Sequence, residues 1–251
     1  MVKQNIHLYN KFAEFYDSLY SHKDYEKEAE FIRKIADKRK TLLDAGCGTG
    51  RFLEILKKDF DCYGFDNSKE FVKIATKRLK GKIFCANLEN FKPKIKTDII
   101  TCIFGTINYL LNYKDIEKFI KNCHEALNSK GILVLDIGFA KQIIDKNSRD
   151  IPKLLVGGIG KRTVARITQA QTGYYASQND ICIINDLFLV KSKKKIDFEI
   201  DQQKYLLIDI LKFKGVMKKR FAVKFYDYFN HREIKDINSI KNRIYVVGIR
   251  K

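Results

Sequence analysis

The sequence predicts an α/β protein: a doubly wound, mostly parallel sheet with helices on both faces and an antiparallel β insertion. Strand and helix patterns alternate over the first 140 residues, and such alternation implies right-handed βαβ crossovers. Several β-rich runs then follow without a helix between them. A helix and two strands end the chain, so we expect a seven-stranded core sheet whose last strand is antiparallel, with the insertion after strand five.

The N-terminal part is expected to form two short helices, because aromatic residues from Phe12 to Tyr20 recur at helical spacing and a second amphipathic stretch covers 25–36. The strands then expected lie at 41–45, 62–65, 82–86, 98–104 and 132–137. The helices expected between them begin at about 51 and cover 68–79 and 114–127.

The second part contains β-rich runs at 163–170, 181–190 and 196–200. Asp209 can cap a helix that runs to about residue 219, since aspartate accepts hydrogen bonds from the free N–H groups of a first turn. The last expected elements are strands at 221–229 and 243–249, joined by a charged surface loop at 230–241. Three segments follow from this order: a core with N-terminal helices at 1–140, a β-rich insertion at 141–208, and a completing part at 209–251.

Composition indicates one folding unit. The chain has 251 residues, 45% of them hydrophobic, and only two prolines, without a linker-like stretch. It shows neither a secretory signal nor an apolar run of bilayer length, so we expect a soluble, cytoplasmic protein. The six cysteines are scattered and read as reduced, buried side chains, and the four histidines form no ligand cluster, so no metal is expected.

The formal net charge of +19 raises nucleic acid as a partner, because clustered lysine and arginine neutralise phosphates. Short basic runs occur at 38–40, 191–195 and 218–220, but most lysines are dispersed. Dispersal favours a solvated, lysine-rich surface over a nucleic-acid footprint.

The most informative segment is a glycine-rich turn, Asp44-Ala-Gly-Cys-Gly-Thr-Gly50, after a buried strand. Glycines there allow positive φ and close contact between backbone and ligand. A dinucleotide fingerprint needs a glycine three residues after Gly48, where Arg51 stands, and a P-loop needs Lys-Ser/Thr after its last glycine. Both nucleotide motifs are therefore disfavoured.

The remaining pattern, Asp44-x-Gly46-x-Gly48-x-Gly50, resembles the first motif of class I methyltransferases that use S-adenosylmethionine (SAM), which are Rossmann-like. The resemblance implies that the backbone from Gly46 through Cys47 to Gly50 carries the amino-acid end of SAM. It also implies that Asp44 orients the ammonium group of that end.

Two further positions follow from the same resemblance. Asp66 ends the second strand, where it can accept both ribose hydroxyls; alternatively Asp66, Asn67 and Ser68 only cap the next helix. Asn87, followed by Leu88, stands where the family usually has an acid that contacts the adenine amine. Its amide oxygen can still accept from that amine, or Asn87 is a plain turn residue.

The end of the fourth strand, Thr101 to Leu110, is where a class I enzyme presents its acceptor. An Asn-Pro-Pro-Tyr-like motif for base amines is absent, and Cys102 lies inside the strand rather than in a position to attack a pyrimidine. Together with Tyr9 to Tyr20 and the insertion, this region resembles nucleotide-linked amino-sugar N,N-dimethyltransferases, and more widely glycine N-methyltransferase-like enzymes. The resemblance implies N-methylation of a small amine such as an amino sugar or an amino acid.

Aromatic rings suit a positive sulfonium, and the candidates are Tyr16, Tyr20, Phe104 and Tyr109, although such a stripe is also typical of core packing. Tyr16 and Tyr109 are the predicted catalytic residues, with Tyr109 as proton acceptor. The predicted substrate-binding residues are Tyr20, Asn108, Tyr109, Arg162 and Arg166. The insertion is either a substrate-recognition layer or the surface of a homodimer.

Two other functions remain open from the sequence. An RNA methyltransferase would use the basic surface as its footprint, and would require lysine and arginine around the mouth of the SAM cleft. A non-catalytic SAM-binding protein is compatible with the departure at Asn87 and with the absence of a recognisable base.

Overall fold

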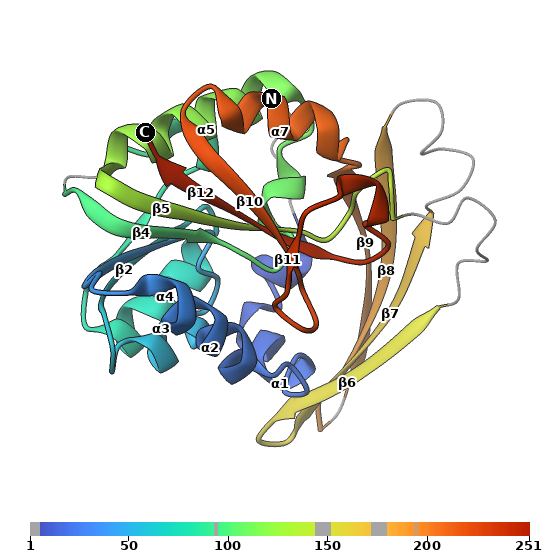
Figure 1. Cartoon of the computed structure of the whole chain (residues 1–251). Coiled ribbons are helices and arrows are strands. Elements are labelled where there is room, and N and C mark those ends of the chain that lie inside the picture. Colours follow the sequence, from blue (N-terminus) through green and yellow to red (C-terminus); the bar gives the residue numbers. More distant parts are fainter. Residues whose placement is uncertain (1–5, 93–94, 144–151, 172–179, 194) are drawn as a thin grey trace.

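The computed structural model describes residues 6–92, 95–143, 152–171, 180–193 and 195–251 (Figure 1). A central sheet has helices on both faces, and a second, antiparallel sheet stands beside it. The helices are η1 (His7–Tyr9), η2 (Ala13–Phe15), α1 (Tyr16–Leu19), α2 (Tyr25–Ala36), α3 (Arg51–Leu56), α4 (Lys69–Leu79), η3 (Leu88–Asn90), η4 (Thr106–Tyr109), α5 (Tyr113–Ala126), α7 (Ile210–Lys218) and η5 (Ile237–Ser239). The strands are β1 (Thr41–Ala45), β2 (Asp61–Asp66), β3 (Ile83–Cys85), β4 (Thr97–Cys102), β5 (Leu127–Ile137), β6 (Lys153–Ile159), β7 (Arg162–Gln171), β8 (Ile181–Lys191), β9 (Ile196–Leu206), β10 (Phe221–Asp227), β11 (Glu233–Ile234) and β12 (Ile244–Arg250).

The central sheet has the strand order β11-β10-β12-β5-β4-β1-β2-β3. Strand β1 lies between two parallel neighbours, with Asp44 opposite Gly64 of β2 and Thr101 of β4. Strand β12 is antiparallel to both β5 and β10. The predicted seven-stranded, doubly wound sheet with an antiparallel last strand is therefore confirmed, and the two-residue β11 extends its edge.

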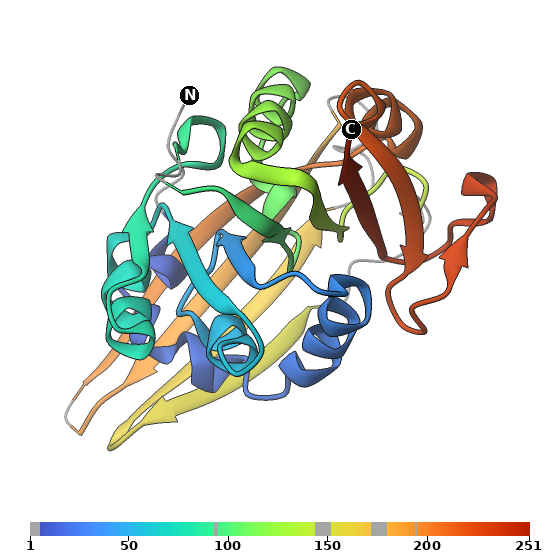
Figure 2. The same ribbon diagram turned by 60° about the vertical axis from the view of Figure 1, so that its left-hand side comes forward.

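Helices cover both faces of this sheet, and each face buries its own apolar cluster. Helices α2, α3 and α4 contribute to one cluster, which includes Phe31, Phe52 and Ala75. Helices α5 and α7 contribute to the other, with Phe119 and Phe213 fully buried. Figure 2 shows the two helical layers on opposite sides of the sheet.

Polar caps set where the helices begin. The side chains of Asp24, Ser68, Asn112 and Asp209 accept hydrogen bonds from backbone N–H groups in the first turns of α2, α4, α5 and α7. Such caps replace the partners that a helix start lacks. The predicted cap at Asp209 is confirmed; at the start of α4 the side chain that accepts from Phe71 N (3.1 Å) is Ser68.

The second sheet has the order β6-β7-β8-β9, all antiparallel. One face buries Val164, Phe188 and Val190 against the N-terminal residues Phe12 and Phe15. Strand β6 was not expected from the sequence, because its two glycines weaken a strand pattern. Gly157 is needed for close approach, since a Cβ there would lie 2.8 Å from the backbone nitrogen of Leu19.

Three other expectations were wrong in detail. The 230–241 stretch holds β11 and η5 and is not a plain loop. The first predicted helix is broken into η2 and α1. Cys85 is exposed, whereas the other five cysteines are buried, and all six are free thiols.

Among the described helices, none has the length and apolar character that a membrane span requires.

Candidate active site

A cavity of about 270 Å³ opens at the edge of the central sheet where β1, β2 and β4 end. Its size lies just below the range of roughly 300–1,000 Å³ that is usual for small-molecule sites. Parallel sheets bind ligands at this edge, because the loops after neighbouring strands diverge there. The N-terminal segment contributes Tyr9 and Tyr16 to the wall opposite the sheet.

The turn after β1 forms the floor of the cavity. Gly46 and Gly48 both have positive φ, at 78° and 55°. A Cβ on Gly46 would lie 2.4 Å from Thr106 Cγ2, whereas one on Gly48 would meet no atom within 4 Å. Gly46 is therefore required by close packing, while the bare backbone of Gly48 faces open space that a ligand could fill.

Asp44 lines the cavity and is almost fully buried. One of its carboxylate oxygens accepts a hydrogen bond from the hydroxyl of Thr101 (2.7 Å). Burial raises the pKa of Asp44 to about 7, and the charges of Asp66 and Asp136 add to this shift, while the Thr101 hydrogen bond opposes it. A cationic ligand group beside Asp44 would stabilise the carboxylate form.

Asp66 ends β2 and also lines the cavity. Its two oxygens accept hydrogen bonds from the backbone N–H groups of Gly48 and Ser68, each at 2.9 Å. Burial raises the pKa of Asp66, and the backbone hydrogen bonds oppose this effect. Each carboxylate oxygen has more than one lone pair, so Asp66 can still accept from a ligand hydroxyl. A contact with ribose is thus compatible with the hydrogen bonds that Asp66 accepts from the backbone.

The loop after β3 closes one end of the cavity with Ala86, Asn87, Leu88 and Glu89. Asn87 precedes η3, and its side chain makes no capping hydrogen bond there. A simple capping function therefore does not explain Asn87, and its amide remains available to a ligand.

Phe104 follows β4 in the left-handed conformation, with φ of 62°. Asp136 of β5 holds this turn, because its carboxylate accepts from the backbone N–H groups of Phe104 and Gly105, both at 2.6 Å. Left-handed backbone is costly for a bulky residue and persists where surrounding contacts fix it. The result is that the Phe104 ring is presented to the cavity.

Aromatic rings form the wall above the glycine turn. Tyr16 contacts Tyr9, Tyr20 and Phe71 through ring centroids 4.7 to 6.2 Å apart. Burial raises the pKa of Tyr16 well above its ordinary value. Tyr16 therefore remains a neutral phenol, and its predicted catalytic role is restricted to contact and hydrogen bonding.

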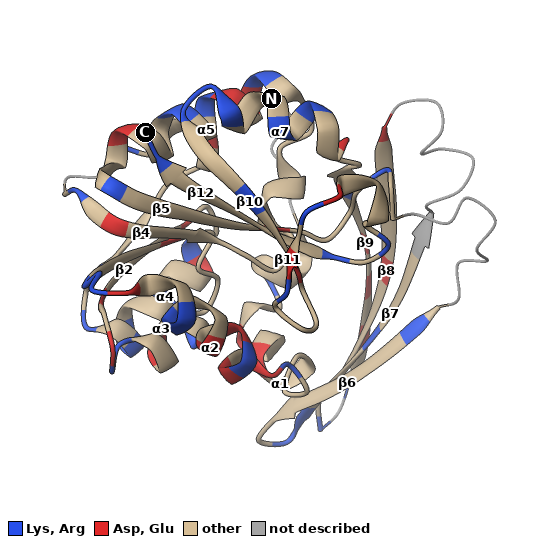
Figure 3. Ribbon diagram, in the orientation of Figure 1, with Lys and Arg blue, Asp and Glu red and all other residues tan. Residues whose placement is uncertain are grey.

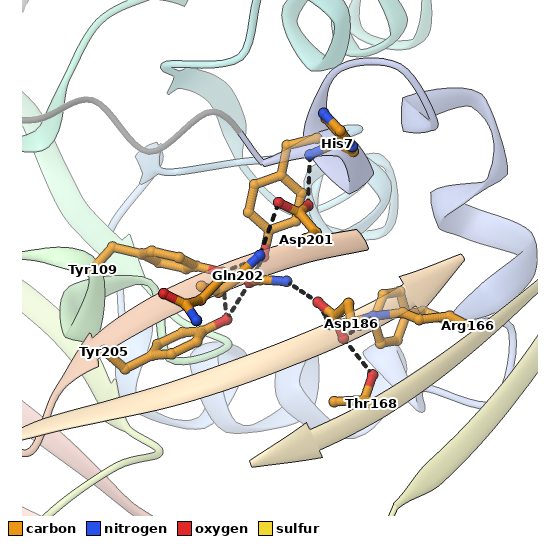
Figure 4. A network of polar contacts seen from close by, with 11 residues as sticks. His7, Tyr109, Arg166, Thr168, Asp186, Asp201, Gln202 and Tyr205 are labelled. Carbon is orange, nitrogen blue, oxygen red and sulfur yellow. Dashed lines mark hydrogen bonds and ion pairs between the residues drawn. The ribbon is translucent and has the colours of Figure 1, made fainter. Parts of the chain in front are cut away.

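Tyr109 lies where the second sheet meets the cavity (Figure 4). Its hydroxyl donates to Gln203 Oε1 (2.6 Å) and makes short contacts with the hydroxyls of Tyr9 and Tyr205. Burial raises the pKa of Tyr109 well above its ordinary value, and the neighbouring tyrosines add to the shift. A phenolate base at Tyr109 is thus disfavoured, and as a neutral hydroxyl it can accept only a hydrogen bond.

The same network continues into a buried ion pair (Figure 4). Gln203 Nε2 donates to Asp186 Oδ2 (2.6 Å), and Arg166 binds both oxygens of Asp186 at 2.9 and 2.8 Å. Arg166 also donates to the hydroxyl of Tyr20. Since these donors are engaged within the protein, the predicted contact of Arg166 with the substrate is not supported.

Most of the predicted site residues meet in the cavity. Those that line it are Tyr16, Asp44, Gly46, Cys47, Gly48, Asp66, Asn67, Asn87, Leu88, Phe104 and Tyr109. Those that do not are Tyr20, Gly50, Asn108, Arg162 and Arg166.

Asn108 is fully buried and donates to the backbone oxygens of Phe139 and Leu206 (2.7 and 2.8 Å). It ties η4 to the ends of the second sheet and does not face a ligand. Arg162 forms an ion pair with Glu14 (2.6 Å) at the surface. Gly50 precedes α3, and a Cβ on it would lie 3.1 Å from that of Ala75. The predicted ligand contacts of these residues are therefore not supported.

Other residues at the site were missed by sequence reasoning. The cavity also receives Tyr9, Tyr25, Thr49, Arg51, Ser68, Phe71 and Thr106. Gln203 and Tyr205 reach Tyr109 from the second sheet. A signal for the latter pair exists, because Asp201, Gln203 and Tyr205 alternate along β9 and share one buried face.

Comparison with known proteins agrees with this geometry. Residues 42–131 match the family described as a methyltransferase domain. This part of the chain is a class I SAM-dependent methyltransferase domain. The cofactor of such a domain is SAM, and the glycine turn with Asp44 and Asp66 lies within the matched residues.

Two curated proteins align with the methyltransferase domain. A putative methyltransferase, YqeM of Bacillus subtilis, is 27% identical over 138 residues, which cover 52% of this chain and 55% of that protein. A dTDP-3-amino-3,4,6-trideoxy-alpha-D-glucopyranose N,N-dimethyltransferase of Streptomyces venezuelae is 28% identical over 132 residues, covering 49% and 56%. The chain thus spans about half the length of the curated relatives it matches.

The similarity in structure extends beyond the methyltransferase domain. The crystal structure of Streptomyces venezuelae DesVI covers 96% of this chain and 98% of its own, with a TM-score of 0.78 and 20% identity. A SAM-dependent methyltransferase from Clostridium acetobutylicum covers the same shares, with a TM-score of 0.76 and 18% identity. At these identities the comparison shows that both sheets share a known fold.

Proposed function

We propose that this chain is an enzyme that transfers a methyl group from SAM to the nitrogen of a small amine, with an amino sugar as the favoured class of acceptor. The observation that supports it most is that one cavity joins the glycine turn and its two acids to a group of neutral hydroxyls supplied partly by the second sheet. The first side suits SAM, and the second suits a polar, uncharged or weakly basic acceptor.

The residues on the cofactor side fit SAM by their chemistry. Gly48 leaves room against the backbone, Asp44 offers a buried acid for an ammonium group, and Asp66 offers acceptors for two hydroxyls. The rings of Tyr16 and Phe104 suit a positive sulfonium, because the face of an aromatic ring attracts cations. SAM, when bound, supplies a methyl group on a positively charged sulfur.

On the acceptor side, the protein must hold the amine in line with that methyl group and exclude water. With SAM bound, the N–C bond would form as the C–S bond breaks, S-adenosylhomocysteine would leave, and the methylated ammonium product would lose its proton on release to solvent. Tyr109, as a neutral hydroxyl fixed by Gln203, can accept a hydrogen bond from the amine N–H and orient its lone pair. This positioning role replaces the predicted proton transfer.

The printed names of the relatives favour the amino-sugar class. The Streptomyces venezuelae relative is an N,N-dimethyltransferase of a nucleotide-linked amino sugar. The RNA alternative receives less support, because Arg51 is the one basic side chain among the described residues of the cavity wall, beside Asp44, Asp66 and Glu89. Lysine and arginine are interspersed with acids over the elements visible in Figure 3.

Calorimetric titration with S-adenosylhomocysteine tests the cofactor side. We expect micromolar binding by the wild type, a loss of roughly 100-fold in Asp66→Ala, and no binding of NADH. Asp66→Asn keeps one of the two oxygens that accept from Gly48 and Ser68, and circular dichroism of both variants shows whether they are folded. No binding by folded wild-type protein would contradict the proposal.

Transfer of a labelled methyl group then tests the reaction. Amino-sugar nucleotides, free amino acids and RNA are compared as acceptors, and mass spectrometry counts the methyl groups added. Methylation of RNA alone would favour the alternative, and binding of the cofactor without transfer to any amine would favour a non-catalytic SAM-binding protein.

We also propose that the chain forms a homodimer through the outer face of the second sheet, the face turned away from the core. Its apolar side chains are 36% to 72% exposed: Leu154, Val156, Ile167, Leu189, Ile196, Phe198 and Ile200. They lie in cross-strand register, for example Leu189 opposite Phe198. A contiguous apolar patch of this kind on an exposed sheet face is typical of a protein–protein interaction surface.

Sedimentation of Phe198→Glu tests this interface. We expect the variant to be monomeric at concentrations where the wild type is dimeric, because a buried unpaired charge opposes association. Leu211→Glu is the control, since Leu211 is also exposed (57%) but lies on α7. A monomeric wild type, or an unaffected dimer in Phe198→Glu, would overturn the proposed surface.

A further inference from the structure

Lys23 is a cation placed among rings at the rim of the cavity. Its Nζ lies 4.3 Å from the ring centroid of Tyr20, 4.6 Å from that of Phe104 and 5.5 Å from that of Tyr16. Phe104 and Tyr16 themselves line the cavity. The ammonium group is therefore separated from the cavity by no more than the rings that form its wall.

The ammonium of Lys23 has no anionic partner in the described part of the chain. It forms no ion pair with an aspartate or glutamate within 4.0 Å, and its hydrogen bond goes to the hydroxyl of Tyr16 (3.4 Å). Burial lowers the pKa of Lys23, which reflects the cost of holding this charge away from water. Cation–π contacts offset that cost only in part, so the site favours an incoming anion.

The amino-acid end of SAM carries one positive and one negative group. The cavity provides a buried acid, Asp44, for the positive group. Among its described lining residues, the one cation is Arg51, which already pairs with Glu54 (3.3 Å) and is half exposed. The negative group thus lacks a dedicated partner in the cavity wall itself.

We propose that Lys23 binds the carboxylate of the amino-acid end of SAM, so that Lys23 and Asp44 together recognise its two opposite charges. The inference rests on the proposed function, because it requires that the cavity binds this cofactor. The four-carbon stem of lysine lets the ammonium move past the rings to reach the carboxylate. Lys23 is then a cofactor-positioning residue that also fixes how far the methyl group extends toward Tyr109.

The test compares three ligands by calorimetry. S-adenosylhomocysteine carries both charges, S-adenosyl-3-thiopropylamine lacks only the carboxylate, and 5′-methylthioadenosine lacks the whole amino-acid end. We expect the wild type to prefer S-adenosylhomocysteine over the thiopropylamine by roughly 10- to 100-fold, the worth of one charge-assisted hydrogen-bonded contact.

In Lys23→Met this preference should disappear, while the affinity for 5′-methylthioadenosine stays within about twofold, which also shows that the variant is folded. Lys27→Met, on the exposed side of α2, should bind all three ligands as the wild type does. Arg51→Met is the competing assignment and should retain the preference.

The outcomes are distinct. A wild type that binds none of the three ligands contradicts the proposed function. A wild type that binds them without a preference for the carboxylate overturns the assignment of Lys23 even if Lys23→Met does not fold. Unchanged preference in Lys23→Met, or loss of preference in Arg51→Met instead, also overturns it.

Discussion

The two sheets bury charge in opposite ways. At the end of the central sheet, Asp44 and Asp66 are buried without an ion-pair partner among the described residues, and their hydrogen bonds come from a hydroxyl and from backbone N–H groups. In the second sheet, Asp186 accepts hydrogen bonds from two nitrogens of the Arg166 guanidinium, from Thr168 and from Gln203. An unpaired buried charge is costly, whereas a paired and hydrogen-bonded one is tolerated. The first arrangement lacks a cationic group that a ligand could supply. In the second, the charge is paired by side chains of the protein itself.

The largest expected effect lies in the completed network. Asp186→Asn leaves the guanidinium of Arg166 buried without a counter-charge, so the free energy of unfolding should fall by about 3–5 kcal/mol. Urea unfolding measures it. Glu117→Gln, which removes the exposed partner of Lys219 (3.0 Å), should change stability by less than about 1 kcal/mol. Equal effects of the two variants would remove the distinction between the sheets.

Asp44→Asn should raise the free energy of unfolding, whereas Asp186→Asn should lower it. The pKa of Asp44 is raised from 3.8 to about 7, so the folded protein binds this proton more tightly than the unfolded chain. The ionised carboxylate therefore destabilises the fold, fully above pH 7 and progressively less toward pH 4. We expect the variant to be more stable than wild type by about 1–3 kcal/mol at pH 8, with the gain shrinking at pH 5. A loss of stability at pH 8 would contradict the unpaired character of Asp44.

The affinity for S-adenosylhomocysteine should depend on pH through the same group. A ligand ammonium favours ionised Asp44, so binding should be strongest above pH 7 and weaken by up to about tenfold per unit below it. Calorimetry between pH 8 and pH 5.5 measures this slope. Asp44→Asn should bind more weakly and show a flat profile, and a wild-type profile equally flat would place the ammonium elsewhere.

The smallest effect is expected where the two regions meet. Tyr109→Phe removes one hydroxyl from the cluster with Tyr9, Tyr205 and Gln203, which should cost about 1 kcal/mol of stability. Cofactor affinity should stay within about twofold, while kcat with an amine acceptor falls roughly tenfold because the acceptor loses its orienting group. An unchanged kcat would show that Tyr109 is only structural.

How much could be predicted from the sequence also differs between the two regions. The glycine turn, Asp44 and Asp66 are local signals, since a strand, a turn and a helix start follow one another along the chain. The central sheet was therefore predicted almost completely, and most of the residues assigned to the cofactor line the cavity. Strand β6 and the inward face of β9 were not predicted, because glycines weaken the first pattern and pairing across the sheet defines the second.

The misassigned residues have a common physical cause. Arg166 and Asn108 are polar side chains whose partners, Asp186 and the carbonyl of Leu206, are distant along the chain. Residue type indicates that such groups need partners, but not whether the partner is a ligand or the protein. Lys23 was missed for another reason, because a lysine is usually solvated and its contact with the ring of Phe104 joins residues distant along the chain.

The chain leaves the central sheet and returns to it at neighbouring positions, since Ala140 and Ile208 form a parallel bridge. The second sheet could therefore be replaced by that of a structurally similar protein without altering the connections of the methyltransferase domain. The N-terminal residues Leu8, Phe12 and Phe15 would have to be replaced together with the sheet, because they pack against its inner face. The natural unit for changing acceptor choice by engineering is thus a pair of segments distant in sequence, and a graft of the insertion alone would expose their apolar contact.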